Sequence, residues 1–231
     1  MTLSIVVLGG LTLYAMAGQQ QGSEQAAASA GRPGTGAQAG QEPKVTQRGR
    51  ETFTPATGSS QLFGKGRPLR YGVDVEDGVG QDPDAFAKEV DRILADAKGW
   101  TAKGTAFQRA DRPPYDFTVH LASPDTTDTL CAKYGLDTGG EVNCSGGPDV
   151  VVNLKRWLLL SPYYKGQPDM YHALIVNHEV GHRLGRGHQG CSGRGKPAPV
   201  MMQQIKGLHG CTPNAWPYDS DGRPLDGPSA P

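Results

Sequence analysis

Three histidines and a glutamate are concentrated in one eleven-residue segment, HEVGHRLGRGH, at residues 178–188. The segment satisfies the pattern H-E-x-x-H-x-x-G-x-x-H at every specified position, which is far more specific than H-E-x-x-H alone. His178 and His182 are four residues apart, so a helix would place both imidazoles on one face, one turn apart. This spacing allows both to bind one tetrahedral Zn²⁺. Glu179 lies beside them and is predicted to reach a water at the metal without being a ligand.

The third ligand requires the chain to leave the helix, because His188 lies too far along a continuing helix to reach the same ion. Gly185 permits this reversal, since glycine adopts the left-handed conformation that ends helices without steric cost. Three neutral imidazoles leave a fourth position open for water, as in catalytic rather than structural zinc sites. The predicted chemistry is therefore hydrolysis assisted by one Zn²⁺, with Glu179 as the general base.

Simpler interpretations exist for these residues. The histidines could be ordinary core or surface residues, although three in one register with Glu179 and Gly185 argue against this. Glu179 could instead be an outer carboxylate of a non-catalytic zinc site, in an exported, zinc-stabilised module that binds a cell-envelope partner. We expect the enzyme, because a binding module would be free to lose its general base. The remaining histidines show no such pattern and are interpreted as structural: His120, His172 and His209.

The segment PVMMQ at 199–203 follows the third histidine. With the histidine pattern, it resembles the metzincin clan of zinc peptidases, whose members carry a methionine in a tight turn beneath the metal. The resemblance implies Met201 as the turn residue, with Met202 as the alternative. It also implies a zincin-like α+β fold with a small mixed sheet, two main helices and an irregular C-terminal part. The implied substrate is a peptide or protein, held as an added strand along a sheet edge for which DVVVNL at 149–154 is the candidate.

A longer set of landmarks is similar to an actinobacterial family of unknown function with a zincin-like core. These landmarks, spread over about residues 60–218, are RYGVDVEDG, DAKGW, LASP, VNHEVGHRLGRGH, APVMMQQ and GCTPNAWP. This resemblance implies a fold and a metal but no substrate. The chain departs from the better-known metzincins at Gln203, where some members have a tyrosine that assists the transition state. It also has no cysteine ahead of the domain to bind zinc and silence the enzyme.

Hydrophobic periodicity predicts the elements that must position this segment. Alternating apolar residues predict a strand that begins near Leu69, and apolar residues at helical spacing predict a helix between Asp82 and Gly99. A second helix, from about Asp169 to Leu184, would carry the histidine motif. Further strands are expected at 106–109, 116–121 and 149–154. Strands and one helix, then a motif helix and a loop-rich end, indicate an α+β domain.

The N-terminal part of the chain differs from the rest. Residues 3–17 are apolar but shorter than the roughly 20 that span a bilayer, so 1–17 is predicted to be a signal peptide, or alternatively an N-terminal anchor. Residues 18–60 are rich in Gln, Ala, Gly and Pro, which predicts a disordered linker ahead of a folded domain at 61–231. Lys plus Arg and Asp plus Glu both number 23, so no attraction to nucleic acid is expected. We expect a secreted or extracytoplasmic monomer.

Four cysteines occur in the chain: Cys131, Cys144, Cys191 and Cys211. In an exported protein they predict two disulfides, for which three pairings exist. Pairing by neighbourhood joins Cys131 to Cys144 and Cys191 to Cys211. The alternative, cysteines as zinc ligands, requires close pairs such as C-x-x-C, which the sequence lacks.

Overall fold

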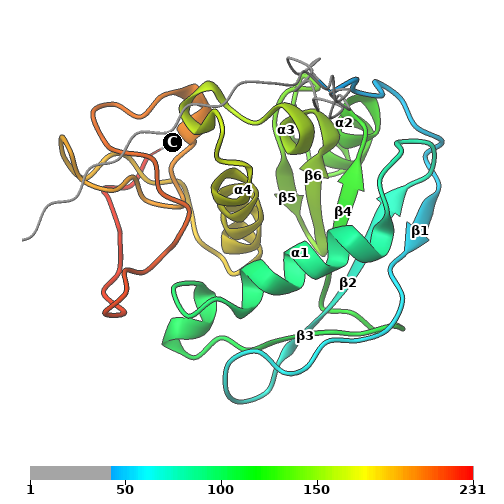
Figure 1. Cartoon of the computed structure of the whole chain (residues 1–231), viewed down its shortest axis with the longest axis horizontal. Coiled ribbons are helices and arrows are strands. Elements are labelled where there is room, and N and C mark those ends of the chain that lie inside the picture. The colour runs from blue at the N-terminus through cyan, green and yellow to red at the C-terminus, as the bar shows by residue number, and fades with distance from the viewer. Residues whose placement is uncertain (1–42, 231) are drawn as a thin grey trace, which may run out of the picture. The chain divides into compact units, whose positions relative to one another are not determined.

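A six-stranded mixed sheet is the framework of the structure, a computed structural model that describes residues 43–230 (Figure 1). Strands β2, β4 and β6 are parallel neighbours in its middle, and β1 and β5 pair antiparallel with β2 and β6 at the two edges. Strand β3 pairs in parallel with the start of β2. The strands are β1 (Phe53–Pro55), β2 (Leu69–Glu76), β3 (Phe107–Arg109), β4 (Phe117–Ala122), β5 (Cys144–Gly146) and β6 (Asp149–Asn153).

Helices pack on both faces of this sheet. In the described residues the α-helices are α1 (Pro83–Ala95), α2 (Pro124–Ala132), α3 (Leu154–Leu159) and α4 (Pro168–Arg183). Side chains alternate between the two faces of a strand, and Val150 and Val152 of β6 join the core that contains α1 and α4. Val151, between them, packs with Cys131 of α2 on the other face. The chain is therefore a mixed α/β domain with the motif helix on its larger core.

The two main helices are those expected from the sequence, α1 from its apolar spacing and α4 from the histidine motif, whereas α2 and α3 are not predicted. Helix α2 has the sequence PDTTDTLCA, whose large apolar residues, Leu130 and Cys131, stand together near its end. Such a segment has no apolar stripe. Helix α3 has six residues, less than two turns, which is too short for a period to emerge. Beyond α4 the chain is irregular apart from a short 3₁₀ turn, as expected, and it lies beside that helix (Figure 1).

Residues 43–60 belong to the folded domain, so the linker boundary predicted at residue 60 is wrong. Strand β1 extends the sheet, and the carboxylate of Glu76, 1 % exposed, accepts hydrogen bonds from the backbone N–H groups of Glu51 and Ser123 and from the Thr126 hydroxyl. The segment is held mainly by polar contacts, which leave no hydrophobic pattern in the sequence. The signal peptide or anchor predicted at 1–17, and the linker up to residue 42, lie outside the described residues.

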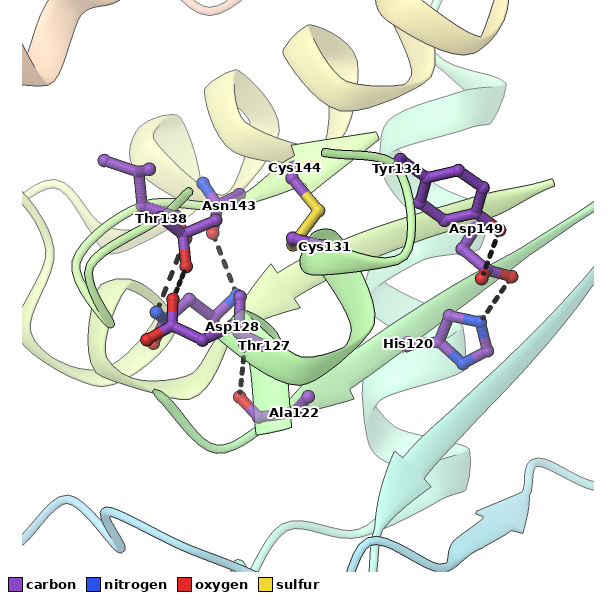
Figure 2. Close-up of a disulfide and its surroundings, with 12 residues drawn as sticks. His120, Ala122, Thr127, Asp128, Cys131, Tyr134, Thr138, Asn143, Cys144 and Asp149 are labelled. Atoms are coloured by element: carbon purple, nitrogen blue, oxygen red, sulfur yellow. Dashed lines mark hydrogen bonds and ion pairs between the residues drawn. A yellow bond between two sulfur atoms is a disulfide. The ribbon is translucent and has the colours of Figure 1, made fainter. Parts of the chain in front are cut away.

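Both disulfides follow the predicted pairing. Cys131 of α2 is bonded to Cys144 of β5 (Figure 2), and Cys191 is bonded to Cys211 in the C-terminal part. These bonds are typical of proteins that fold outside the cytoplasm. They also exclude the cysteines as metal ligands. No helix within residues 43–230 is long and apolar enough to cross a bilayer.

His120 of β4 lies between two carboxylates on the face of the sheet that α2 covers. Its Nδ1 is 2.7 Å from Asp74 Oδ1 on β2, and its Nε2 is 3.4 Å from Asp149 Oδ1 on β6. Tyr134 donates a hydrogen bond to the other oxygen of Asp149 (Figure 2), and the Phe53 ring packs edge-on against the imidazole. Burial alone would lower the pKa of His120, but the hydrogen bonds to Asp149 and Asp74 outweigh it and raise the pKa to about 9.

We predict that His120 makes the free energy of unfolding fall between about pH 6.5 and pH 9. Its folded pKa lies above the roughly 6.5 of an unfolded histidine, so the protonated ring stabilises the fold fully below that pH. This contribution is lost as the pH rises through 9, and its upper bound is about 3 kcal/mol. Urea unfolding of wild type and His120→Gln across this range measures it. Parallel stability curves for the two proteins would contradict the assignment.

Candidate metal centre

The last two turns of α4 bring the three predicted histidine ligands together with a chain segment that follows the helix. His182 Nε2 lies 3.2 Å from His178 Nε2 and 3.1 Å from His188 Nε2. We call His178, His182 and His188 the histidine cluster. In the part of the chain that the structure describes, it is the one group of three or more His, Cys, Asp or Glu residues whose ligand atoms lie close enough to hold a metal.

Backbone carbonyls orient two of these rings from behind. His178 Nδ1 lies 2.8 Å from the carbonyl oxygen of Val200, and His182 Nδ1 lies 2.8 Å from that of Arg186. A carbonyl only accepts hydrogen bonds, so each Nδ1 carries the proton and each Nε2 presents a lone pair to the centre of the cluster. Lone pairs this close repel one another unless a cation lies between them, so the donor set fits a metal ion.

Burial keeps two of these imidazoles, those of His178 and His182, neutral, as metal ligation requires. The side chain of His178 is buried, and burial together with the neighbouring His182 lowers its pKa to about 3. Burial is also the largest cause that lowers the pKa of His182. Both rings are therefore uncharged at neutral pH.

The chain reverses after α4 through a hydrogen-bonded helix end. Gly185 has φ +80°, its N–H donates to the His182 carbonyl, and the N–H of Arg186 donates to the Gly181 carbonyl. This is the Schellman arrangement, in which the residue with positive φ is usually glycine. The Arg186 carbonyl then accepts the hydrogen bond from the His182 ring. One turn thus ends the helix, orients the second histidine and directs the chain toward the third.

A tight turn closed by the Met202 N–H and the Pro199 carbonyl lies against this end of α4. Met201 is 2 % exposed and packs on Gly181, where a Cβ would overlap its sulfur. The Met201 carbonyl also accepts from the N–H of Gln189, next to the third histidine. Met202 instead lines the cavity beside the cluster. Met201 therefore lies between the end of the helix and the returning chain.

A cavity of about 460 Å³ opens beside the histidine cluster. Its walls come from one face of α4, the edge strand β5 and the segment 202–206. Glu179 lines it and is 5 % exposed, and burial raises the pKa of this carboxyl to about 8. A dication at the histidines would oppose that shift, because a neighbouring positive charge favours the carboxylate.

The sheet edge next to this cavity is β5, so the prediction of DVVVNL at 149–154 as the edge is wrong. Strand β6 pairs with β4 on one side and β5 on the other, and its valines are buried. A continuous run of β-branched residues is typical of a strand buried on both faces rather than of an edge. The actual edge, Cys144–Gly146, has three residues and no hydrophobic pattern to reveal it.

The C-terminal residues hold the third histidine in place, a role that the sequence analysis missed. The N–H of Ala230 donates to the His188 carbonyl, and the N–H of Gly190 donates to the Pro228 carbonyl. Gln189 and Ser229 form a β-bridge between the same two segments. No sequence signal marks this contact, because it consists of backbone hydrogen bonds that any residue types can make.

The histidines outside the cluster serve the fold, whereas one tyrosine of α4 reaches the cavity. His172 stacks on Trp157 at 3.6 Å between ring centroids, and His120 belongs to the carboxylate cluster of the sheet. Tyr164 and Tyr171 are buried, as packing residues are, but Tyr171 also lines the cavity. Tyr171 is thus both a core residue and part of the cavity wall.

Residues 39–219, which are 181 of the chain's 231 residues, match a family described as a protein of unknown function, DUF3152. The chain belongs to this family. The match includes the histidine cluster, Glu179 and the methionine turn, whereas the C-terminal residues that hold His188 lie outside it. No curated protein and no solved structure matches the chain. Membership of DUF3152 therefore supplies no activity, and the function has to be argued from the site.

We predict that Gly185→Ala lowers the free energy of unfolding by about 1–2 kcal/mol, the cost of an L-residue in the left-handed region. A Cβ at this position would meet no atom within 4 Å, so the effect comes from the backbone alone. Gly187→Ala is the matched control, because Gly187 also has open space around it and its φ is not positive. Chemical unfolding of both variants measures the difference, and equal losses would contradict the role of Gly185.

Proposed function

We propose that this protein is an exported zinc-dependent metallopeptidase of the metzincin type, which hydrolyses peptide bonds. The observation that carries the proposal is the convergence of three histidine Nε2 atoms at the wall of a cavity that also holds Glu179. The Nε2 atom of His182 lies 3.1–3.2 Å from the other two, and the Nδ1 atoms of His178 and His182 are bonded to backbone carbonyls. Cation, general base and space for a substrate would then meet at one point.

The architecture supports a zincin-like assignment. Helix α4 carries the first two histidines, the helix end at Gly185 directs the chain to the third, and the Met201 turn packs on Gly181 of the same helix. Antiparallel strand β5 borders the cavity at the edge of a mixed sheet. These are the features that the resemblance to the metzincin clan implies.

Strand β5 would bind the substrate backbone. In the described residues it pairs with β6 on one side and has no strand on the other. An extended peptide could add to that free side through backbone hydrogen bonds, which orient it along the cavity. The three residues of β5 limit this contact to a short stretch of substrate.

A zinc ion held by His178, His182 and His188 would supply a Lewis acid that polarises the scissile carbonyl and acidifies water. Glu179 accepts a proton from the attacking water as the water oxygen forms a bond to the carbonyl carbon. The same carboxyl then gives this proton to the leaving nitrogen when the C–N bond breaks. The low exposure of Glu179 limits its contact with bulk water, which favours transfer of the proton within the site.

The disulfides support action outside the cytoplasm. Both lie in the folded domain, and the pair at Cys131 and Cys144 fixes a wall of the cavity. We propose that residues 1–17 direct the chain across the membrane and are then removed or retained as an anchor. The substrate would accordingly be a peptide or protein of the cell envelope or its surroundings, bound by a monomeric enzyme.

We predict that Glu179→Gln retains about one zinc per chain and lowers peptide hydrolysis by roughly 10²–10⁴-fold, the usual contribution of a general base. Glutamine has nearly the shape of glutamate but does not accept the proton. Metal analysis and mass-spectrometric digestion of a peptide library, on wild type and variant, measure both quantities. Undiminished cleavage by the variant would exclude Glu179 as the base. Zinc without cleavage by wild type would favour a zinc-stabilised binding module.

We predict that His182→Ala weakens zinc binding by more than about 100-fold, since even groups that only orient a ligand contribute 10–100-fold. His209→Asn is the control, because this histidine lies outside the cluster and its φ of 48° is one that asparagine tolerates. Competition with a chromogenic chelator gives both affinities. Equal zinc binding by wild type and His182→Ala would refute the ligand set.

A further inference from the structure

The cavity beside the histidine cluster continues along α4 away from the histidines. Tyr171, Ile175 and His178 follow one another at helical spacing, and all three line it. Tyr171 precedes His178 by seven residues, about 10 Å along the helix axis. An extended peptide advances about 3.3 Å per residue, so this end of the cavity lies within about three residues of the bond at the histidines.

A buried cation, Arg156 of α3, lines this end of the cavity. Its residue exposure is 9 %, and it lies near Tyr171, where burial raises the pKa of the hydroxyl to about 12 against the opposing charge of Arg156. One guanidinium nitrogen donates to the Leu160 carbonyl and another lies 3.3 Å from Glu141 Oε2. Within the described residues the Nε of Arg156 has no hydrogen-bond partner. A buried guanidinium normally satisfies its donors more completely.

The carboxylate that faces Arg156 is shared and exposed. The side chain of Glu141 is 56 % exposed, and its other oxygen is paired with Lys155, the neighbour of Arg156. Two cations thus share one anion, which leaves a net positive charge beside the cavity. Lys206 adds a further cation to the lining, whereas the exposed Asp137 opposes it.

Apolar side chains share the cavity wall with polar ones. The apolar lining residues are Leu136, Val142, Leu174, Ile175, Met202 and Ile205. A ligand group that fits such a space has an aliphatic body and a carboxylate at its end. Glutamate has this form, and so does a C-terminal apolar residue with its free carboxylate. A carboxylate accepts charge-assisted hydrogen bonds from arginine, which are stronger than those between neutral groups.

We propose that Arg156 makes the site select substrates with a carboxylate within about three residues of the scissile bond. The inference rests on the proposed peptidase function and extends it to a substrate class. Arg156 is a specificity-determining residue here, since it lies away from the reacting atoms. Its contacts with Leu160 and Glu141 also support the fold, so its test needs a readout that stability alone does not change.

Lys155→Gln and Arg156→Gln form a matched pair for this test. Both remove a cation that contacts Glu141 from adjacent positions of α3, but of the two only Arg156 lines the cavity. The zinc-loaded full chain and these variants would digest a synthetic peptide library made with free and with amidated C-termini. The same variants in a Glu179→Gln background, immobilised, would capture peptides from that library without cleaving them.

We expect wild type and Lys155→Gln to favour peptides with a carboxylate over their amide counterparts by about tenfold, as a charge-assisted hydrogen bond provides. Arg156→Gln should reduce this ratio to about one, and Arg156→Lys should restore part of it. Glu141→Gln, which removes the competing carboxylate, should raise it. If the preference for carboxylate peptides persists when their C-termini are amidated, the selected carboxylate belongs to a side chain. If the preference disappears, the selected carboxylate is the C-terminal one.

The inference would be overturned if wild type and Arg156→Gln showed the same preference for carboxylate peptides. It would also be overturned if wild type showed no such preference, or if Lys155→Gln lost it as fully as Arg156→Gln does. If Arg156→Gln does not fold, two other variants decide the question: relative to wild type, the preference for carboxylate peptides should fall in Arg156→Lys and rise in Glu141→Gln. Arg156-dependent capture without any cleavage would contradict the proposed hydrolysis and keep the carboxylate subsite. Cleavage without Arg156-dependent selection would contradict the carboxylate subsite and keep the proposed hydrolysis.

Discussion

The site depends on the reversal of the chain between His182 and His188. Three imidazole nitrogens meet only if the chain leaves the helix within one turn of the second histidine. The Schellman hydrogen bonds at Gly185 and Arg186 produce that reversal, and the Arg186 carbonyl also orients the His182 ring. The backbone contact between His188 and Ala230 then holds the returning segment. The fold thus holds the lone pairs of the histidine Nε2 atoms close together, and a bound cation would relieve their repulsion.

The opposite wall of the cavity is a short strand that needs support from outside itself. Three residues of β5 form few hydrogen bonds with β6, but Cys144 is bonded to α2. The loop before β5 is held by Asn153, whose side chain donates to the Gly140 carbonyl and whose backbone N–H donates to the Asn143 side chain. These contacts fix the strand edge against the sheet. A site that binds an extended chain requires such a fixed edge, because ordering it at each binding event would cost affinity.

The charges of the site are separated along α4. Burial lowers the pKa values of His178 and His182 and raises that of Glu179, so a cation at the cluster would be the main charge there. The guanidinium of Arg156 lies at the Tyr171 end of the cavity. A substrate bound between them would meet a Lewis acid at one end and a permanent cation at the other. Under the proposed function, this division would let one cavity combine hydrolysis at one end with selection of the substrate at the other.

What the sequence by itself determined is local. The motif spacing placed His178, Glu179 and His182 on one helix and required a reversal at Gly185, and periodicity located α1, α4, β2, β4 and β6. Neighbouring cysteines were paired correctly, because short loops bring their ends together readily. Only the tertiary structure decided which strand is the edge, that residues 43–60 join the sheet, that the C-terminal residues hold His188, and that Arg156 lines the cavity. These features arise from backbone hydrogen bonds and from contacts between distant segments, which leave no period or motif in the order of the residues.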